Sequence, residues 1–262
     1  MQDRIILCIK WGDLFSADYV NVLFRAVSAN LKPGFRFICL TDQADGLEKG
    51  IITSQIPHID LTPEQIRAPG VWRKIALFHP DVAALAPGAR ALFIDLDMII
   101  FGPLDKTFDT LGEIVMLDTG HDWRDRDPVQ PSTGVFAFTL GEQQRILKTF
   151  LTDPSGAMAN FHNEQDFVAA HATEVSLWPT GYVSSFKRHL VHRYGLDLIL
   201  PPRQPPAGPA IIAFHGDPRP ADLLRAGIWG RFPHLGRGPI KWVQDYWTNY
   251  GGMLPNSKEN AF

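Results

Sequence analysis

A cysteine framework, long apolar runs and an excess of positive charge are all missing from this sequence. The two cysteines, Cys8 and Cys39, stand inside apolar segments, which predicts buried free thiols and fits a reducing cytoplasm; a disulfide would require these segments to be neighbours. No apolar run reaches the length of a membrane-spanning helix, and residues 1–13 make a poor signal peptide. The formal net charge of −3 gives no reason to expect a nucleic-acid partner.

Glycine-rich phosphate loops are also missing, which argues against the dinucleotide-binding and P-loop classes. What is present is an ordinary globular composition, with 45% hydrophobic and 20% charged residues among 262. This length can bury a large core. We expect one cytoplasmic domain over residues 1–250, followed by a C-terminal tail over residues 251–262.

The first 42 residues predict the core of an α/β fold. Residues 4–10 and 35–40 have the composition of buried strands, and residues 17–31 between them carry apolar side chains at helical spacing. This order implies parallel pairing with a right-handed crossover, so the polar residues after both strands lie at the same edge of the sheet. These residues are Lys10, Trp11, Thr41 and Asp42. Such an edge is a natural nucleotide site.

Further apolar segments predict the rest of the fold. Strands are expected over 51–56, 91–94, 113–117, 134–140 and 210–214, and helices over 70–78, 142–151, 163–170 and 241–250. We expect the aromatic stripe of the last helix to pack on the core, the alternative being a membrane or acceptor surface. The polar run 118–133 is predicted to be a surface loop or a mobile lid.

Two carboxylates follow the most apolar predicted strand. Asp95 and Asp97 are two positions apart, so a strand presents both to the same side. Carboxylate oxygens favour Mg²⁺ or Mn²⁺, whose remaining ligands are usually waters and substrate phosphates. An isolated Asp-x-Asp is equally typical of residues that cap a turn or helix.

Three other groups of polar residues are candidates for the same site. The adjacent cations Arg73 and Lys74 are typical of a solvated helix face. Their position before the Asp-x-Asp strand also makes them candidates for binding a diphosphate or a sugar hydroxyl. Residues 163–166 read as an acidic helix start, which capping alone explains. His215 ends a strand and can complete a metal site, or it can be an ordinary hydrogen-bonded histidine.

The order of these motifs resembles a known family. The matching segments are Asp95-Leu96-Asp97, Ser132-Thr133-Gly134-Val135-Phe136, Glu164-Gln165-Asp166 and His215-Gly216-Asp217-Pro218-Arg219-Pro220. Together they resemble nucleotide-sugar glycosyltransferases of the GT-A fold, of the glycogenin and lipopolysaccharide galactosyltransferase type. The start of the chain resembles an uncharacterised bacterial branch. The resemblance covers about residues 4–220.

The resemblance implies an α/β GT-A fold with a mostly parallel sheet flanked by helices, and retaining transfer from a nucleoside diphosphate sugar, usually a UDP-sugar, to a glycan, lipid or protein acceptor. Mn²⁺, or Mg²⁺, would be held by Asp95, Asp97 and His215. Catalytic candidates are Glu164, Gln165 and Asp166, beside the anomeric carbon. Donor-binding candidates are Lys10, Trp11, Thr41, Asp42, Arg73, Lys74, Asp95, Lys187 and Arg219. Peripheral membrane contact is compatible with this reading.

Two departures from the family pattern bear on these roles. The wider family carries its metal histidine three residues before the motif glycine, a position that is Ala213 here, whereas His215 directly precedes Gly216. The family also tends to have asparagine in the stretch aligned with residues 131–133, so donor-sugar contacts there cannot be transferred.

Two alternatives stay open at this point. A haloacid-dehalogenase-like phosphatase would use Asp95 as nucleophile and Asp97 as acid/base, with Asp217 and Asp222 holding Mg²⁺. Its first motif usually has Thr or Val where this chain has Ile99. The other alternative is a non-catalytic nucleotide-sugar-binding protein on the same fold.

Overall fold

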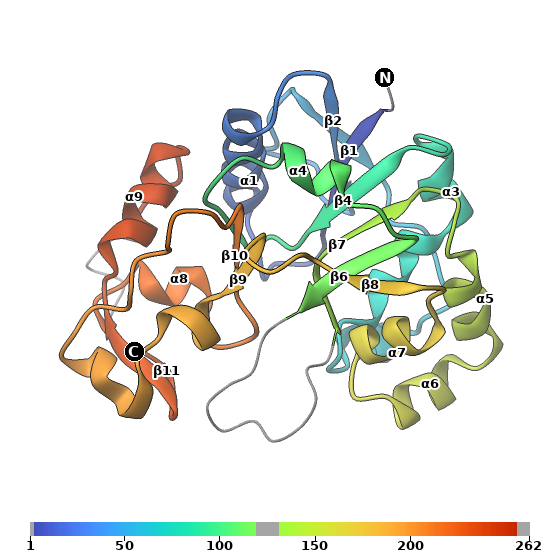
Figure 1. Ribbon diagram of the computed structural model, residues 1–262. Coiled ribbons are helices and arrows are strands. Elements are labelled where there is room, and N and C mark those ends of the chain that lie inside the picture. The colour runs from blue at the N-terminus through green and yellow to red at the C-terminus, as the bar shows by residue number, and fades with distance from the viewer. Residues whose placement is uncertain (1–2, 119–130, 256–262) are drawn as a thin grey trace.

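The computed structural model describes residues 3–118 and 131–255, and its centre is a seven-stranded sheet (Figure 1). The strand order is β3-β2-β1-β4-β7-β6-β8. The bounds are β1 (Arg4–Lys10), β2 (Phe35–Thr41), β3 (Ile51–Ser54), β4 (Arg90–Ile94), β6 (Ile114–Asp118), β7 (Pro131–Thr139) and β8 (Val175–Leu177). β7 is antiparallel to β4 and β6, and the other pairings are parallel. The predicted mostly parallel α/β sheet is confirmed.

Two small sheets accompany the central one. β5 (Ile99–Ile100), β10 (Ile211–Ala213) and β9 (Val183–Ser185) form a three-stranded sheet, and β11 (Gly227–Arg231) pairs with β12 (His234–Gly238) as a hairpin. β5 begins four residues after Asp95, so the first strand of the three-stranded sheet follows the two carboxylates directly in the chain.

Helices cover both faces of the central sheet. They are α1 (Ala17–Asn30), α2 (Pro63–Arg67), η1 (Trp72–Phe78), α3 (Pro80–Ala84), α4 (Asp105–Asp109), α5 (Gln144–Thr152), α6 (Pro154–Asn160), α7 (Glu164–His171), η2 (Phe186–Leu190), η3 (Arg193–Leu198), α8 (Pro220–Leu223) and α9 (Lys241–Asn249). Figure 1 shows α1 and α9 on one side of the sheet and α3, α5 and α7 on the other. No described helix has the length and apolarity needed to cross a membrane.

Alternation along β1 explains the two layers. Ile5 and Leu7 pack with η1, α5 and α7, whereas Ile6 and Cys8 pack with α1. The predicted parallel pairing of the first two strands is confirmed, and its register sets Cys8 opposite Cys39. Both thiols are fully buried and free, as the sequence predicted, although their strands are neighbours.

Two expectations about chain segments can now be compared with the structure. The aromatic stripe of α9 packs on the core, because Trp247 is buried and Tyr246 and Tyr250 contact the same apolar clusters. The expected loop over 118–133 is wrong at its end: β7 starts at Pro131, and Ser132 and Thr133 are buried. Residues 119–130 of that segment, and 256–262 of the expected tail, lie outside the described residues.

Candidate functional site

Asp95 and Asp97 line a cavity of about 490 Å³ beyond the carboxyl end of β4. The backbone N–H of Asp95 donates to the carbonyl oxygen of Gly134 at 2.9 Å, which ties this turn to β7. The other lining residues are Gly70, Val71, Lys74, Met98, Ser132, Thr133, Gly134, His162, Asn163, Glu164, Gln165, Phe214, His215, Gly216 and Arg219. Both carboxylates therefore face one cavity, although β4 ends at Ile94 and the pair lies in the turn after it, in which the Met98 N–H donates to the Asp95 carbonyl oxygen at 3.2 Å. The expectation that strand alternation aligns the two side chains is wrong. In addition, the side chain of Asp95 pairs with Lys74.

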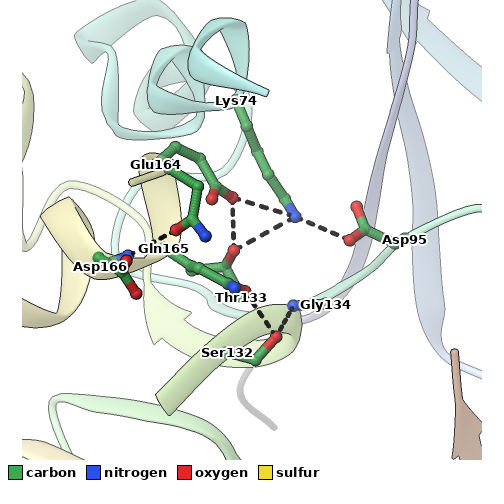
Figure 2. A network of polar contacts seen from close by, with 9 residues as sticks. Lys74, Asp95, Ser132, Thr133, Gly134, Glu164, Gln165 and Asp166 are labelled. Carbon is green, nitrogen blue, oxygen red and sulfur yellow. Dashed lines mark hydrogen bonds and ion pairs between the residues drawn. The ribbon is translucent and has the colours of Figure 1, made fainter. Parts of the chain in front are cut away.

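Lys74 connects three elements at the floor of this cavity (Figure 2). From η1, its Nζ lies 2.8 Å from Asp95 Oδ2 and 3.3 Å from Glu164 Oε1, and donates to Thr133 Oγ1 at 3.3 Å. The Thr133 hydroxyl in turn donates to Glu164 Oε1 at 2.5 Å. Lys74 is only 5% exposed, so the interpretation of residues 73–74 as a solvated helix face is wrong for this residue.

Burial and charge pairing act against each other in this network. Burial disfavours the charged form of Lys74, but Asp95 and Glu164 outweigh it and raise the lysine pKa. Burial raises the pKa of Asp95 and of Glu164, and Lys74 partly offsets both shifts. For Asp97, burial and the neighbouring charge of Asp95 raise the pKa to about 7, since Lys74 and Arg219 compensate only in part. Burial is therefore the main reason that the Asp97 carboxyl resists ionisation, and the neighbouring Asp95 adds to the effect.

Helix α7 begins at the cavity wall. The side chain of Asn163 caps it by accepting the N–H of Asp166 at 3.0 Å. Gln165 accepts the Ser132 hydroxyl at 2.8 Å, so the amide is fixed against β7 (Figure 2). Glu164 is buried beside Lys74, which capping alone does not require. Glu164 and Gln165 line the cavity, whereas Asp166 is not among its lining residues.

The motif after β10 supplies the opposite wall. His215 and Arg219 both line the cavity. Burial and the nearby charges of Lys187 and Arg188 lower the His215 pKa to about 3, so the imidazole is neutral. Its Nε2 is buried and has no hydrogen-bond partner among the described residues. Lys187 lies next to Gly216, outside the cavity lining.

A second cavity of about 200 Å³ adjoins the first, because Val71, Asp95, Asp97 and Arg219 line both. Its remaining lining residues, Ile9, Trp11, Leu14, Phe15 and Leu96, are apolar. The Arg219 guanidinium lies 5.8 Å from the centroid of the Phe15 ring. The pair of cavities thus offers an apolar compartment, a charged junction and a polar compartment in series.

The remaining donor-binding candidates lie beside these cavities rather than in their linings. Arg73 Nη1 pairs with Asp42 Oδ2 at 2.9 Å, and its guanidinium is 6.0 Å from the Trp11 ring centroid. Lys10 Nζ donates to Gln43 at 3.2 Å, and Thr41 Oγ1 accepts the Gln43 N–H at 3.1 Å. Lys10 and Thr41 are opposite each other in the β1–β2 register, so the predicted common edge is confirmed.

The donor set fits a divalent cation in its chemistry. Asp95, Asp97 and His215 line one cavity, which brings two carboxylates together with an imidazole that is neutral and has an unpartnered nitrogen. Within residues 3–118 and 131–255, however, no three His, Cys, Asp or Glu side chains are grouped closely enough to hold a metal ion. Ala213, which stands where the wider family carries its metal histidine, is fully buried in an apolar cluster.

Several lining residues were not singled out from the sequence. His162 and Met98 line the larger cavity, and Phe15 lines the smaller one. Val71 lines both and has a left-handed backbone with φ of 58°, unusual for a β-branched residue. Met98 directly follows Asp97 and His162 directly precedes Asn163, and this adjacency to the predicted motifs is the local signal that could have identified them.

The sheet order, the flanking helices and a ligand-sized cavity at the strand ends define a GT-A fold. An active-site mutant of LgtC aligns with 97% of this chain and 99% of its own, at 14% identity and a TM-score of 0.60. The galactosyltransferase LgtC in complex with donor and acceptor sugar analogues aligns over 97% and 98%, at 15% identity and a TM-score of 0.59. GlyE, a glycosyltransferase of Streptococcus pneumoniae TIGR4, aligns over 94% and 62%, at 12% identity and a TM-score of 0.57.

At these identities the likeness concerns the fold. No protein-family model matches the chain, and a search of curated proteins finds no match.

Proposed function

We propose that this protein is a glycosyltransferase that takes a sugar from a nucleoside diphosphate sugar, with a UDP-sugar as the preferred donor, and transfers it with retention to a glycan, lipid or protein acceptor. The observation that carries the proposal is the pair of adjoining cavities that meet at Asp95, Asp97 and Arg219. A nucleoside diphosphate sugar has a matching order of parts: an aromatic base with apolar ring faces on a ribose, a charged diphosphate and a polyhydroxylated sugar.

In this proposal the smaller cavity takes the nucleoside. Trp11 and Phe15 supply aromatic surface for the base, and the junction receives the diphosphate, where Arg219 balances phosphate charge. Arg73 orients Trp11 through its contact with the indole and its ion pair with Asp42. The likeness to LgtC, which has been solved with donor and acceptor sugar analogues, supports this assignment.

The metal assignment rests on the donor set described above. Asp95 and Asp97, with His215, would hold Mn²⁺ or Mg²⁺ at the junction, where the ion would neutralise charge on the departing diphosphate. Lys74 favours the ionised form of Asp95, because its ammonium lies 2.8 Å from that carboxylate and opposes the pKa rise that burial causes. A cation bound there would favour the ionised form of Asp97, whose pKa is raised to about 7 by burial and by Asp95.

The larger cavity takes the sugar and the acceptor group. Gln165 faces it from α7, held by the Ser132 hydroxyl, and can donate its amide N–H groups to sugar hydroxyls or to a developing charge. Glu164 is engaged with Lys74 and Thr133, which gives it a positioning role at the base of α7. Thr133 links these two groups to β7.

Calorimetric titration of UDP and other nucleoside diphosphates, with Mn²⁺ or with a chelator, tests the proposal. We expect Mn²⁺-dependent UDP binding that Asp97→Asn weakens by about tenfold or more, because the substitution removes one anionic ligand. Asp245→Asn, an exposed residue on α9, is the matched control and should leave binding unchanged. The proposal fails if no nucleoside diphosphate binds in a metal-dependent way. Release of UDP from UDP-sugars, measured with the same variants, then tests turnover.

The two alternatives make different predictions. The phosphatase requires Asp217 and Asp222 beside Asp95, but those two line a separate cavity of about 300 Å³ without Asp95 or Asp97. Phosphatase activity abolished by Asp95→Asn, without UDP affinity, would still favour it. Tight UDP binding without turnover of any donor would favour the non-catalytic binding protein.

A further inference from the structure

A cavity separate from the two at the candidate site lies along β11, and we call it the hairpin cavity (Figure 1 labels β11). Its volume is about 300 Å³, at the lower end of the range of small-ligand pockets. All the residues of β11 line it, together with Asp217, Asp222, Arg225 and Ala226. Since neighbouring residues of a strand point to opposite faces, this lining places the cavity along an edge of β11. Among the described residues β11 pairs only with β12, so backbone N–H and C=O groups on its other edge are available to a ligand.

The charged side chains of the hairpin cavity leave one arginine unmatched. Asp222 Oδ2 accepts the backbone N–H of Arg219 at 2.8 Å. Arg231 Nε lies 3.9 Å from Asp217 Oδ2, and these side chains are 89% and 58% exposed, so the ion pair is weak and both groups can bind a ligand. Arg225 makes no hydrogen bond or ion pair within residues 3–118 and 131–255. The cavity therefore offers a guanidinium for an anionic group and a carboxylate that can accept hydrogen bonds.

Trp229 gives the hairpin cavity a rigid back. Its side chain is 2% exposed, belongs to a core cluster and packs edge-to-face on Phe186, with the ring centroids 5.8 Å apart. The indole is therefore covered and cannot stack on a base, which disfavours a nucleotide in this cavity. Gly227 and Gly230 have positive φ angles of 122° and 70°, a backbone conformation that other residues adopt only with strain. These two glycines allow the backbone of β11 to line the cavity in its present form.

This set of groups is complementary to a sugar unit with one anionic substituent. A guanidinium such as that of Arg225 binds a carboxylate or a phosphate through paired hydrogen bonds. The Asp217 carboxylate can accept hydrogen bonds from hydroxyl groups, and the backbone of the β11 edge can both donate and accept. A neutral sugar would satisfy the polar groups but would leave Arg225 without a counter-charge. An acidic saccharide satisfies both.

The hairpin cavity lies next to the candidate functional site. Gly216 lines the larger cavity of that site, whereas the following residue, Asp217, lines the hairpin cavity. Arg219 lines both cavities of the candidate site, and its backbone N–H is held by Asp222 of the hairpin cavity. Because consecutive Cα atoms are about 3.8 Å apart, the larger cavity and the hairpin cavity are within reach of one oligosaccharide.

We propose that the hairpin cavity binds an anionic sugar unit of the acceptor, with its carboxylate or phosphate on Arg225 and its hydroxyls on Asp217 and the free edge of β11. The reacting end of the same acceptor would occupy the larger cavity. The assignment to the acceptor rests on the proposed glycosyltransferase function, whereas the binding of an anionic saccharide does not. The two parts are therefore tested separately.

Saturation-transfer nuclear magnetic resonance on the full chain tests the cavity with defined probes. Tetragalacturonate carries carboxylates, glucose 6-phosphate carries a phosphate, and maltotetraose is a neutral counterpart. We expect one of the acidic probes to bind about tenfold or more tightly than maltotetraose, and the better of the two identifies the anion. Arg225→Gln should weaken this binding about tenfold, because it removes a charge-assisted hydrogen bond. Arg225→Lys should keep part of the affinity, since it retains the charge but not the paired geometry.

Arg193→Gln is the matched control, because Arg193 is also exposed, lies outside the cavity lining and gives the same change in charge. It should leave probe binding unchanged, and circular dichroism checks that every variant is folded. No binding of either acidic probe, or equal effects of Arg225→Gln and Arg193→Gln, would overturn the proposal. Inorganic phosphate that binds as tightly as both acidic probes would also overturn it, because it would mark a general anion site.

Titration of UDP into the native chain separates this proposal from the donor site. Binding of an acidic probe without any binding of UDP would refute the acceptor role and support a saccharide site. Binding of UDP without any binding of an acidic probe would refute the hairpin cavity as a saccharide site and leave the proposed donor site intact.

Discussion

Replacing Lys74 with methionine tests how much the buried ion pairs at the site contribute to stability. Lys74→Met keeps most of the aliphatic stem but leaves the carboxylates of Asp95 and Glu164 without their cation, which sits 2.8 and 3.3 Å from them. Removing one partner of a buried pair costs about 3–5 kcal/mol, because an uncompensated charge stays in a low-dielectric interior. We expect a loss of this size in the free energy of unfolding, measured by urea denaturation.

Lys241→Met provides the matched control. Lys241 also lies 2.8 Å from a carboxylate, that of Asp245, but its side chain is 84% exposed. Water screens such a pair, so its loss should cost less than about 1 kcal/mol. Glu164→Gln added to Lys74→Met should recover part of the loss, since it removes one of the two stranded charges. Equal losses for the two lysine variants, or no recovery in the double variant, would refute the reasoning that burial sets the magnitude.

Two further perturbations address the helix that carries Gln165 and the buried thiols. Asn163→Ala removes the cap of α7 and should cost about 1 kcal/mol in urea denaturation. Asn160→Ala, an exposed change in α6, should cost less than about 0.5 kcal/mol, and a reversed order would contradict the capping argument. Cys8 and Cys39 should not react with Ellman's reagent in the folded protein, because burial and the neighbouring thiol raise the Cys8 pKa. Reaction of both thiols before unfolding in urea would show that β1 and β2 open locally.

Local sequence patterns were sufficient to predict the central sheet and the position of the two carboxylates relative to it. Buried runs and helical spacing predicted β1, α1 and β2, because periodicity records which face of an element is covered. The same reasoning put Asp95 and Asp97 directly after β4, and both line the larger cavity, but they lie in a turn and not on one side of a strand. Their role as metal ligands stays a prediction.

Motif order gave the fold through resemblance, and the likeness to LgtC agrees with it. The contacts of the individual donor-binding candidates could not be predicted in the same way. Asp42 and Arg73 pair with each other beside the cavities, and Lys187 lies next to Gly216 rather than in the cavity lining. Such positions depend on side-chain partners from other elements, and a list of motifs does not contain them.

Tertiary structure alone decided between residues that look alike in the sequence. Arg73 and Lys74 are adjacent cations on η1, yet one pairs with Asp42 at a partly exposed edge and the other is buried with Asp95. Thr133 and Glu164 have the polarity of a loop and an exposed helix start, yet both are buried, hydrogen-bonded to each other and in contact with Lys74. The sequence by itself determined which segments are buried and where polar residues end them. Which charges meet was decided by contacts between residues far apart in the chain, because burial of a polar group depends on the partner that compensates it.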